Sequence, residues 1–335
     1  MRYYHLPEFG GVDALRLGER DEPRPGPRQV LVRMRAWSLN HRDLLIARAA
    51  YGRDVRPGVV PLSDGAGEVA ATGEGVTRWR TGDRVVCTVI PRWIAGPPTA
   101  EKVAGMLGGS LDGVLAEYVV FDEEALVAVP AHLSLAEAAT LPCAAVTAWH
   151  ALVEVGGLRP GQRLLTLGTG GVSLFALQLA VAGGARVTAT SGSAGKLDRL
   201  RDLGAADVID HAADPGWGAT VHERSGGGVD HVIEVGGSGT LRQSIEAVRT
   251  GGRISVIGVL SRGEGIGPVP LLRKALSVQG VLVGSREMFE EMNRALERHR
   301  IHPVVDGVFP FCDAADAYRR LASGRHVGKV VIAAD

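Results

Sequence analysis

Two patterns of hydrophobic and polar positions follow one another along the chain. In residues 1–127 apolar and polar residues alternate over short runs, of which Gln29–Arg35 is the clearest. A period of two residues is typical of a half-buried strand, and Gly-, Pro- and Asp-rich turns separate these runs. We therefore predict a β-rich first part, with further strands at Glu68–Ala71, Arg84–Val89 and Ala116–Phe121.

From Ser134 onward, helical and strand patterns take turns. A helix is predicted to begin after Ser134, which is a typical N-cap residue. Strand and helix in turn at this spacing are typical of a parallel sheet covered by helices on both faces. Continuously apolar strands such as Arg253–Leu260 fit the double-sided burial of that sheet.

The last part of the chain is less regular. It holds helical patterns at Met288–Arg298 and Ala314–Ala322 and a final strand at Lys329–Ala333. Elements beyond a complete doubly wound unit indicate that the chain returns to its first domain. We therefore predict an α/β protein with a first domain at residues 1–127, an inserted nucleotide-binding domain at 128–267, and a return at 268–335.

Composition and charge exclude several function classes. The chain has 335 residues, enough for two domains, with 37 basic and 37 acidic residues. This balance offers no general attraction for nucleic acid or for an anionic membrane. Three scattered cysteines provide neither a disulfide framework nor a closed zinc site. Without a signal-peptide pattern or an apolar run of membrane length, the cytoplasm is the expected location.

A glycine-rich turn carries the clearest chemistry. It follows the strand Arg163–Leu167 and opens the helix Val172–Ala182, the context in which G-x-G-x-x-G binds a dinucleotide. The first glycine permits the tight turn and the second lets a pyrophosphate approach the backbone, while Ser173 takes the third position. The predicted cradle consists of Gly168, Thr169, Gly170, Gly171 and Val172.

The end of the next strand bears on the choice of cofactor. Sites that prefer NAD(H) place an acid there for the ribose 2′-hydroxyl. This chain has Ser191, Ser193 and Lys196 instead, which would suit a 2′-phosphate. NADP(H) is therefore preferred over NAD(H); the less favoured alternative is that Lys196 is a solvated residue in the first turn of a helix.

Segments spread over nearly the whole chain resemble the medium-chain dehydrogenase/reductase superfamily. This resemblance implies a GroES-like catalytic domain interrupted by a Rossmann domain, with the active site in the cleft between them, and a homodimer or homotetramer. The segments are Asn40–Asp43, Pro61–Val69, Thr81–Val85, Gly113–Val119, Ala139–Leu152, the glycine-rich turn and Gly328–Val330.

The resemblance also bears on zinc. Aligned on zinc-dependent members, the ligand positions hold Asn40, Ser63 and Cys143, and Asp64 stands beside the second. A catalytic zinc needs about three protein ligands, which one thiol, an amide and an alcohol do not supply. We therefore expect no metal, Cys143 as a buried small residue and Asp64 as a loop-capping carboxylate.

The N-x-x-D form at Asn40 and Asp43 is similar to the zinc-free quinone reductase and enoyl reductase branch. That branch transfers hydride from a nicotinamide to an electron-poor carbon of a small molecule. The resemblance implies catalytic roles for Asn40 and Tyr51, with Asp43 orienting the loop, although Tyr51 is equally compatible with a solvent-facing turn. Trp93 either covers an apolar substrate or simply packs.

The resemblance adds further cofactor positions. Thr147 corresponds to a helix start near the nicotinamide, and His211 to the 2′-phosphate side. The remaining positions are Val259, Ser261, Ser285, Arg286 and Lys329. Two other readings stay open: a zinc-free NAD(P)-dependent alcohol dehydrogenase or carbonyl reductase, and a non-catalytic NADPH-binding protein.

Overall fold

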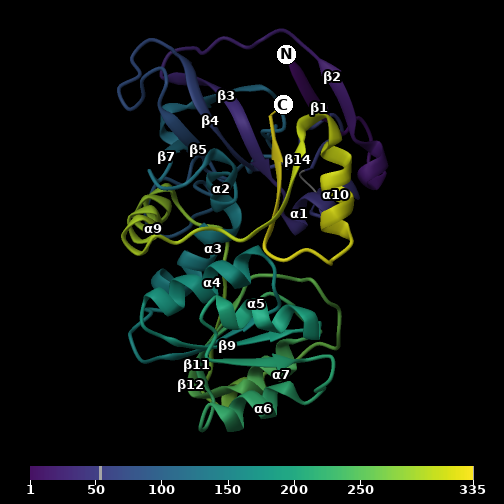
Figure 1. Ribbon diagram of the computed structural model, residues 1–335, viewed down its shortest axis with the longest axis vertical. Coiled ribbons are helices and arrows are strands. Elements are labelled where there is room, and N and C mark those ends of the chain that lie inside the picture. The colour runs from purple at the N-terminus through teal and green to yellow at the C-terminus, as the bar shows by residue number, and fades with distance from the viewer. Residues whose placement is uncertain (53–54, 335) are drawn as a thin grey trace. The chain divides into compact units, whose positions relative to one another are not determined.

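The structure is a computed structural model that describes residues 1–52 and 55–334. Two large sheets organise it (Figure 1). Each sheet belongs to one of two units. Unit 1 comprises Met1–Val146 together with the chain from Val283 onward, and unit 2 comprises Thr147–Leu282. The α/β fold predicted from the sequence, a doubly wound sheet within a β-rich partner, is confirmed.

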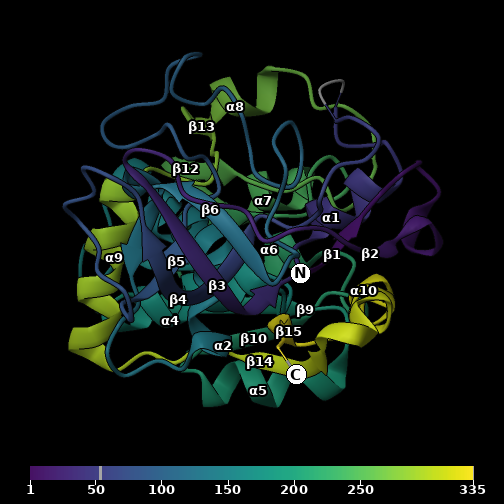
Figure 2. The same cartoon turned by 90° about the horizontal axis from the view of Figure 1, so that it is seen from above.

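The β-rich unit 1 is built around β3, which pairs antiparallel with β4, β6 and β15. In the described residues its main sheet runs β14-β15-β3-β4-β5-β7, and β3, β4 and β5 lie side by side in Figure 2. The strands are β1 (Arg2–His5), β2 (Arg16–Glu19), β3 (Gln29–Ser38), β4 (Asp64–Thr72), β5 (Arg84–Cys87), β6 (Tyr118–Asp122), β7 (Leu126–Ala128), β14 (Val305–Pro310) and β15 (Lys329–Ala333).

Short helices and turns complete unit 1. Ser134 caps α2 as predicted, because its hydroxyl accepts a hydrogen bond from the Glu137 N–H. The core includes the fully buried Trp37, Phe311 and Tyr318. The helical elements are η1 (Gly11–Ala14), α1 (His41–Ala47), η2 (Glu123–Ala125), α2 (Leu135–Ala138), η3 (Leu141–Ala145), α9 (Arg286–His299), η6 (Phe311–Asp313) and α10 (Ala314–Ala322).

Unit 2 is a doubly wound domain. The described part of its sheet is all parallel, in the order β10-β9-β8-β11-β12-β13. The order reverses at β8, where such folds bind ligands beyond the carboxyl ends of the strands. Its strands are β8 (Arg163–Leu167), β9 (Arg186–Ser191), β10 (Asp207–Asp210), β11 (Val229–Glu234), β12 (Val248–Val256) and β13 (Ser277–Gly280).

Helices connect these strands by crossovers, as parallel pairing requires. Apolar side chains of α6, α7 and the central strands form one core that includes Trp217, Val221 and Ile254. The helical elements are α3 (Val146–Trp149), η4 (His150–Val155), α4 (Gly171–Ala182), η5 (Ala194–Lys196), α5 (Leu197–Asp202), α6 (Trp217–Arg224), α7 (Leu241–Ala247) and α8 (Val269–Arg273). Among the described residues no helix has the length and apolar character needed to cross a bilayer.

The unit boundaries differ from those predicted at residues 127 and 267. The first lies at Val146 because α2 packs against β3 and β4 of unit 1. The second lies at Leu282 because β13 pairs in parallel with β12 and extends the sheet of unit 2. Strand β13 has little apolar content, which is why the hydrophobic pattern did not reveal it.

One predicted strand is too long at its end. The apolar run Arg253–Leu260 was expected to be a buried strand, but β12 ends at Val256. Val259 is 72% exposed and Leu260 is 53% exposed. The Ile257 N–H still donates to the carbonyl of Glu234 on β11 at 2.8 Å, and beyond it the chain continues as an exposed loop. Hydrophobicity alone does not distinguish a buried strand from an exposed apolar loop that follows it.

Candidate active site

The glycine-rich turn connects β8 to α4 in unit 2. Gly168 has a φ of +76°, a region that favours glycine. Gly170 caps the helix in an extended conformation, and no side chain occupies the cap. At the third position the Ser173 hydroxyl donates to the carbonyl of Leu167 at 2.6 Å, which ties the helix to the preceding strand.

The space around this turn suits a pyrophosphate. A Cβ added at Gly170 would meet no heavy atom within 4 Å, so the described fold itself leaves room there. The first N–H groups of a helix lack intrahelical partners and attract anions. Nearby, the buried hydroxyl of Thr190 has no hydrogen-bond partner among the described residues, although the carbonyl of Thr190 accepts from Gly168. The turn therefore fits the dinucleotide predicted from the sequence.

Most of the residues predicted to face the 2′-phosphate gather at the end of β9. The Ser193 N–H donates to the Ser191 hydroxyl at 3.1 Å, and the His211 N–H donates to the Ser191 carbonyl at 2.9 Å. A Cβ at Gly192 would stand 2.7 Å from Nε2 of His211. Lys196 ends the next turn, η5. Burial lowers the pKa of His211, so at neutral pH its ring is uncharged.

The loops after β11 and β12 are tied together at Ser261. Both the N–H and the hydroxyl of Ser261 donate to the carbonyl of Gly236, at 2.7 and 2.9 Å. Val259 projects from the same loop and is largely exposed. Thr147, in α3, is buried. No cofactor contact tests the roles predicted for these three residues, and they stay predictions.

Two of the predicted cofactor residues have structural partners in unit 1. Ser285 caps α9, and its hydroxyl accepts from the Met288 N–H at 3.2 Å. Arg286 forms an ion pair with Glu124 and its N–H donates to the carbonyl of Trp93. These contacts account for both residues within the fold of unit 1, and the cofactor role remains an untested prediction.

Glu234 is a buried residue that the sequence did not single out. Its carboxylate accepts hydrogen bonds from the N–H groups of Gly236 and Gly237, at 2.7 and 2.9 Å, and from the hydroxyls of Thr240 and Ser244. It therefore holds the loop that anchors Ser261. An acid at the end of a buried strand, followed by glycines, is the available sequence signal.

The predicted catalytic residues Asn40 and Asp43 lie at the start of α1 in unit 1. The Asn40 N–H donates to Oδ2 of Asp43 at 2.7 Å, which caps the helix, and the orienting role of Asp43 in catalysis stays a prediction. Lys329, predicted with the cofactor residues, lies here: its ammonium donates to the carbonyl of Leu39 at 2.6 Å and to Oδ1 of Asn40 at 2.5 Å. Nδ2 of Asn40 is buried and has no partner among the described residues.

Asp64 joins this group from the start of β4 and is fully buried. Its Oδ1 accepts from the Ser63 hydroxyl at 2.7 Å and its Oδ2 from the Cys143 N–H at 3.2 Å. Nζ of Lys329 lies 3.9 Å from Oδ2. Asp64 thus connects the start of β4, the turn at Cys143 and the start of β15, which fits the predicted loop-capping role. We refer to Asn40, Asp43, Asp64 and Lys329 as the polar cluster.

Burial shapes the protonation of the cluster. It raises the pKa of Asp43 to about 6, against the opposing effects of Arg42 and of the Asn40 N–H. Burial and the nearby Asp64 charge raise the pKa of Cys143 to about 12, so this side chain is a neutral thiol at pH 7. Cys143 is half-buried, which corrects the expectation of a buried small residue. In the part of the chain that the structure describes, no three His, Cys, Asp or Glu side chains are placed to share a metal ion.

Tyr51 is half-buried beneath the long loop that follows β5. The Arg42 guanidinium lies 5.1 Å from the centre of its ring, and its hydroxyl contacts the sulfur of Met106 at 3.8 Å. Burial raises the pKa of Tyr51, so the phenol keeps its proton at neutral pH. Trp93, in the same loop, is fully buried and donates to the carbonyl of Gly96, which favours the packing role.

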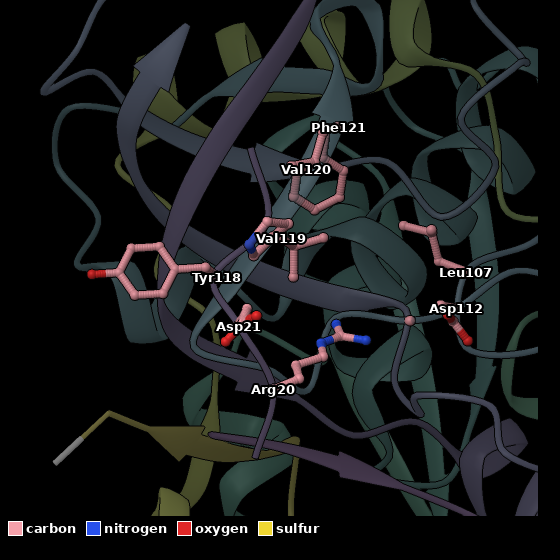
Figure 3. A pocket seen from close by; sticks show the side chains of 10 residues that line it. Arg20, Asp21, Leu107, Asp112, Tyr118, Val119, Val120 and Phe121 are labelled. Atoms are coloured by element: carbon pink, nitrogen blue, oxygen red, sulfur yellow. The ribbon is translucent and has the colours of Figure 1, made fainter. Parts of the chain in front are cut away.

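A separate pocket of about 360 Å³ opens beside β6 of unit 1 (Figure 3). Side chains from β6, from the Arg20–Pro23 segment and from the loop at Leu107 line it. It does not include the members of the polar cluster. The pocket therefore does not define the candidate active site.

Comparison with protein families matches both units. A model for an alcohol dehydrogenase GroES-like domain matches residues 26–131, and a model for a zinc-binding dehydrogenase matches residues 171–298. A zinc-type alcohol dehydrogenase-like protein of Schizosaccharomyces pombe is 43% identical, over 100% of this chain and 99% of the relative. A chloroplastic quinone-oxidoreductase homologue of Spinacia oleracea is 31% identical, over 96% and 95%.

Solved structures agree with these matches. The crystal structure of a putative alcohol dehydrogenase from Sinorhizobium meliloti has a TM-score of 0.91 and 45% sequence identity, over 99% of this chain and 98% of that chain. The likeness therefore extends over both units and is not restricted to the nucleotide-binding part.

Proposed function

The chain belongs to the medium-chain dehydrogenase/reductase superfamily and is a nicotinamide-dependent oxidoreductase, and from this premise we propose that it reduces quinones or α,β-unsaturated carbonyl compounds with NADPH and without zinc. The observation that carries the proposal is the polar cluster. Its positive charge comes from the buried ammonium of Lys329, beside the amide of Asn40. This arrangement can stabilise negative charge on an oxygen atom without a metal.

The donor set supports metal independence. The carbonyl oxygen of Asn40 is engaged by Lys329, and the hydroxyl hydrogen of Ser63 is committed to Asp64. Cys143 is then the single soft donor, whereas a catalytic zinc takes about three protein ligands.

In the proposed reaction the bound nicotinamide supplies a hydride, that is, two electrons and one hydrogen nucleus. Addition of that hydride at the β-carbon would shift the electrons of the double bond and place negative charge on the carbonyl oxygen. Hydrogen-bond donors of the chain stabilise that charge. A proton then completes the saturated product. Tyr51 is our candidate proton donor, because burial keeps its phenol protonated at neutral pH and its hydroxyl contacts the sulfur of Met106, a weak acceptor.

The preference for NADPH rests on the group at the end of β9. No acid follows that strand, and Ser191, Ser193 and His211 lie together with Lys196 in the next turn. Hydroxyl and N–H donors with one lysine match a phosphate dianion. Substituting Lys196→Ala is expected to lower kcat/KM for NADPH about tenfold and to leave the value for NADH within twofold. An equal loss with both cofactors would contradict this assignment.

The reaction class is tested by oxidation of NADPH with three acceptors: a quinone, an enone and a simple ketone. We expect turnover with the first two, and a loss of about a hundredfold in kcat for Tyr51→Phe. Elemental analysis should find well under one zinc per chain, and chelation should leave the rate unchanged. Turnover limited to saturated carbonyls and alcohols would instead establish the alcohol dehydrogenase alternative, which the names of the Schizosaccharomyces and Sinorhizobium relatives favour.

A further inference from the structure

The side chain of Asn40 is held in one orientation by a residue from the far end of the chain. Lys329 is only 3% exposed, and its ammonium donates to Oδ1 of Asn40 and to the carbonyl of Leu39. An ammonium has three donors and no acceptor. The atom of the amide that faces it must therefore be the oxygen.

This constraint determines where the amide nitrogen points. With its oxygen turned to Lys329, Asn40 directs Nδ2 away from the ammonium. Nδ2 is buried and has no hydrogen-bond partner among the described residues. The backbone is held as well, because the Asn40 N–H donates to Asp43. Two amide hydrogens are thus kept out of water with nothing in the described fold to satisfy them.

An unpaired buried donor is costly, and such groups are retained where they serve a ligand. The ammonium also draws electron density from the amide oxygen, which strengthens the N–H groups as donors. Asp64, 3.9 Å from the ammonium, balances its charge so that the lysine remains in place. The combination is a neutral donor, fixed and polarised by a cation behind it.

We propose that Lys329 is a positioning residue, which orients and polarises the Asn40 amide. The N–H groups of that amide then donate hydrogen bonds to the carbonyl oxygen of the substrate. This inference rests on the proposed reduction of conjugated carbonyl compounds and assigns the oxygen-stabilising group of that reaction. It gives Lys329 a role different from direct contact with the cofactor.

The first test is a double-mutant cycle with an enone as acceptor. Lys329→Met and the nearly isosteric Asn40→Asp, which replaces the donor by an oxygen, are each expected to lower kcat about a hundredfold. The kcat of the double variant should be no more than about threefold lower than that of either single variant, because both changes disable the same hydrogen-bond donor. Lys329→Arg, which keeps the charge and donors, should recover at least tenfold over Lys329→Met.

The dissociation constant of NADPH, measured by fluorescence, should stay within twofold in all these variants. Lys274→Met is the matched control, because that ammonium also caps backbone carbonyls, those of Ile245, Glu246 and Val248, but lies outside the polar cluster. It should leave kcat within twofold. Multiplicative losses in the cycle, or a weaker NADPH complex with normal kcat in Lys329→Met, would overturn the proposal.

A second readout does not need turnover. 4-Nitrophenol in the NADP⁺ complex mimics an enolate oxygen, and its colour reports its ionisation. We expect the bound phenol to ionise at least one pH unit lower than the free phenol in the wild type, and to lose that shift in Asn40→Asp and Lys329→Met. If the wild type shows the shift but reduces neither enones nor quinones, the proposed function fails while this inference stands. If it reduces them without any shift, the inference fails alone.

Discussion

At the scale of single residues, Gly168 and Gly170 stand two positions apart in one turn, but the backbone requires glycine only at the first. Gly168 has a positive φ, so any side chain there is strained. Gly170 has a φ of −80° and a ψ of 173°, which any residue adopts, and the space beside it is open. Its lack of a side chain is explained by a ligand that approaches the backbone.

The substitution Gly170→Ala separates binding from folding. We expect the melting temperature to remain within about 2 °C, since no neighbour is displaced, and the dissociation constant of NADPH to rise at least tenfold. Calorimetry and fluorescence titration measure the two quantities. Gly267→Ala, which also enters open space, is the control and should change neither. Unchanged affinity in Gly170→Ala would remove the turn from the cofactor site.

At the scale of elements, β11 carries two buried titratable residues, the histidine His231 and the glutamate Glu234. His231 is 4% exposed and its Nε2 lies 2.8 Å from the Ser255 hydroxyl on β12. Burial lowers its pKa from 6.5 to about 4. At the end of the same strand, the Glu234 carboxylate organises the next loop. The strand therefore links the stability of the sheet to the shape of a loop predicted to bind the cofactor.

His231 makes stability depend on pH. Below pH 6.5 the unfolded chain takes up a proton at this residue, whereas the folded chain does so only near pH 4. The free energy of unfolding therefore falls as the pH decreases through this window, by about 2 kcal/mol between pH 7 and pH 5 from this group. Urea denaturation at both pH values measures the loss, and His231→Gln should reduce the difference by that amount. An equal pH dependence in the variant would contradict the assignment.

Glu234→Gln keeps the shape of the side chain but removes its charge. Hydrogen bonds to a charged acceptor contribute about 1.5–3 kcal/mol each, so we expect a net loss of roughly 2 kcal/mol in unfolding free energy. Because the carbonyl of Gly236 anchors Ser261, the KM for NADPH should rise several-fold as well. The exposed Glu246→Gln in the same unit should alter neither quantity. A change in stability without a change in KM would show that the loop does not shape the cofactor site.

At the scale of the whole molecule, the two edges of the unit 2 sheet differ. All four residues of β13 are exposed, and Val278 and Leu282 are exposed apolar residues on or beside it. The nearby α8 adds Val269 and Leu272, the latter 80% exposed. The opposite edge, β10, instead begins and ends with aspartates. An open edge strand with exposed apolar residues beside it is a template for pairing with another strand.

We propose that a second copy of this chain covers β13, giving the dimer expected from the sequence. A two-fold axis would place the same edge on both copies. Val278→Lys combined with Leu272→Lys should convert the dimer to a monomer in light scattering at micromolar concentration. Leu17→Lys, at another exposed apolar position, on β2, should leave the mass unchanged. A wild-type monomer would refute the proposal.

What could be predicted from the sequence was local. The alternation of strands and helices, the N-cap at Ser134 and the turn Gly168–Ser173 depend on neighbours within a few residues, and the structure contains all three. The absence of an acid after β9 could also be seen in the sequence, because it concerns only the residues at the end of one strand. The end of β12 could not be predicted, since the apolar run continues past Val256 into a loop whose Val259 and Leu260 are exposed.

The polar cluster was decided by tertiary structure. Asn40 could be singled out as a candidate, but its partner Lys329 is 289 residues away. Antiparallel pairing of β15 with β3 sets Val331 opposite Ser38, and this register brings Lys329 level with Asn40. Pairing register is a property of the assembled sheet, so the sequence around either residue does not indicate it. The sequence by itself determined the fold class and the dinucleotide turn, whereas only the sheet determined which cation faces the amide.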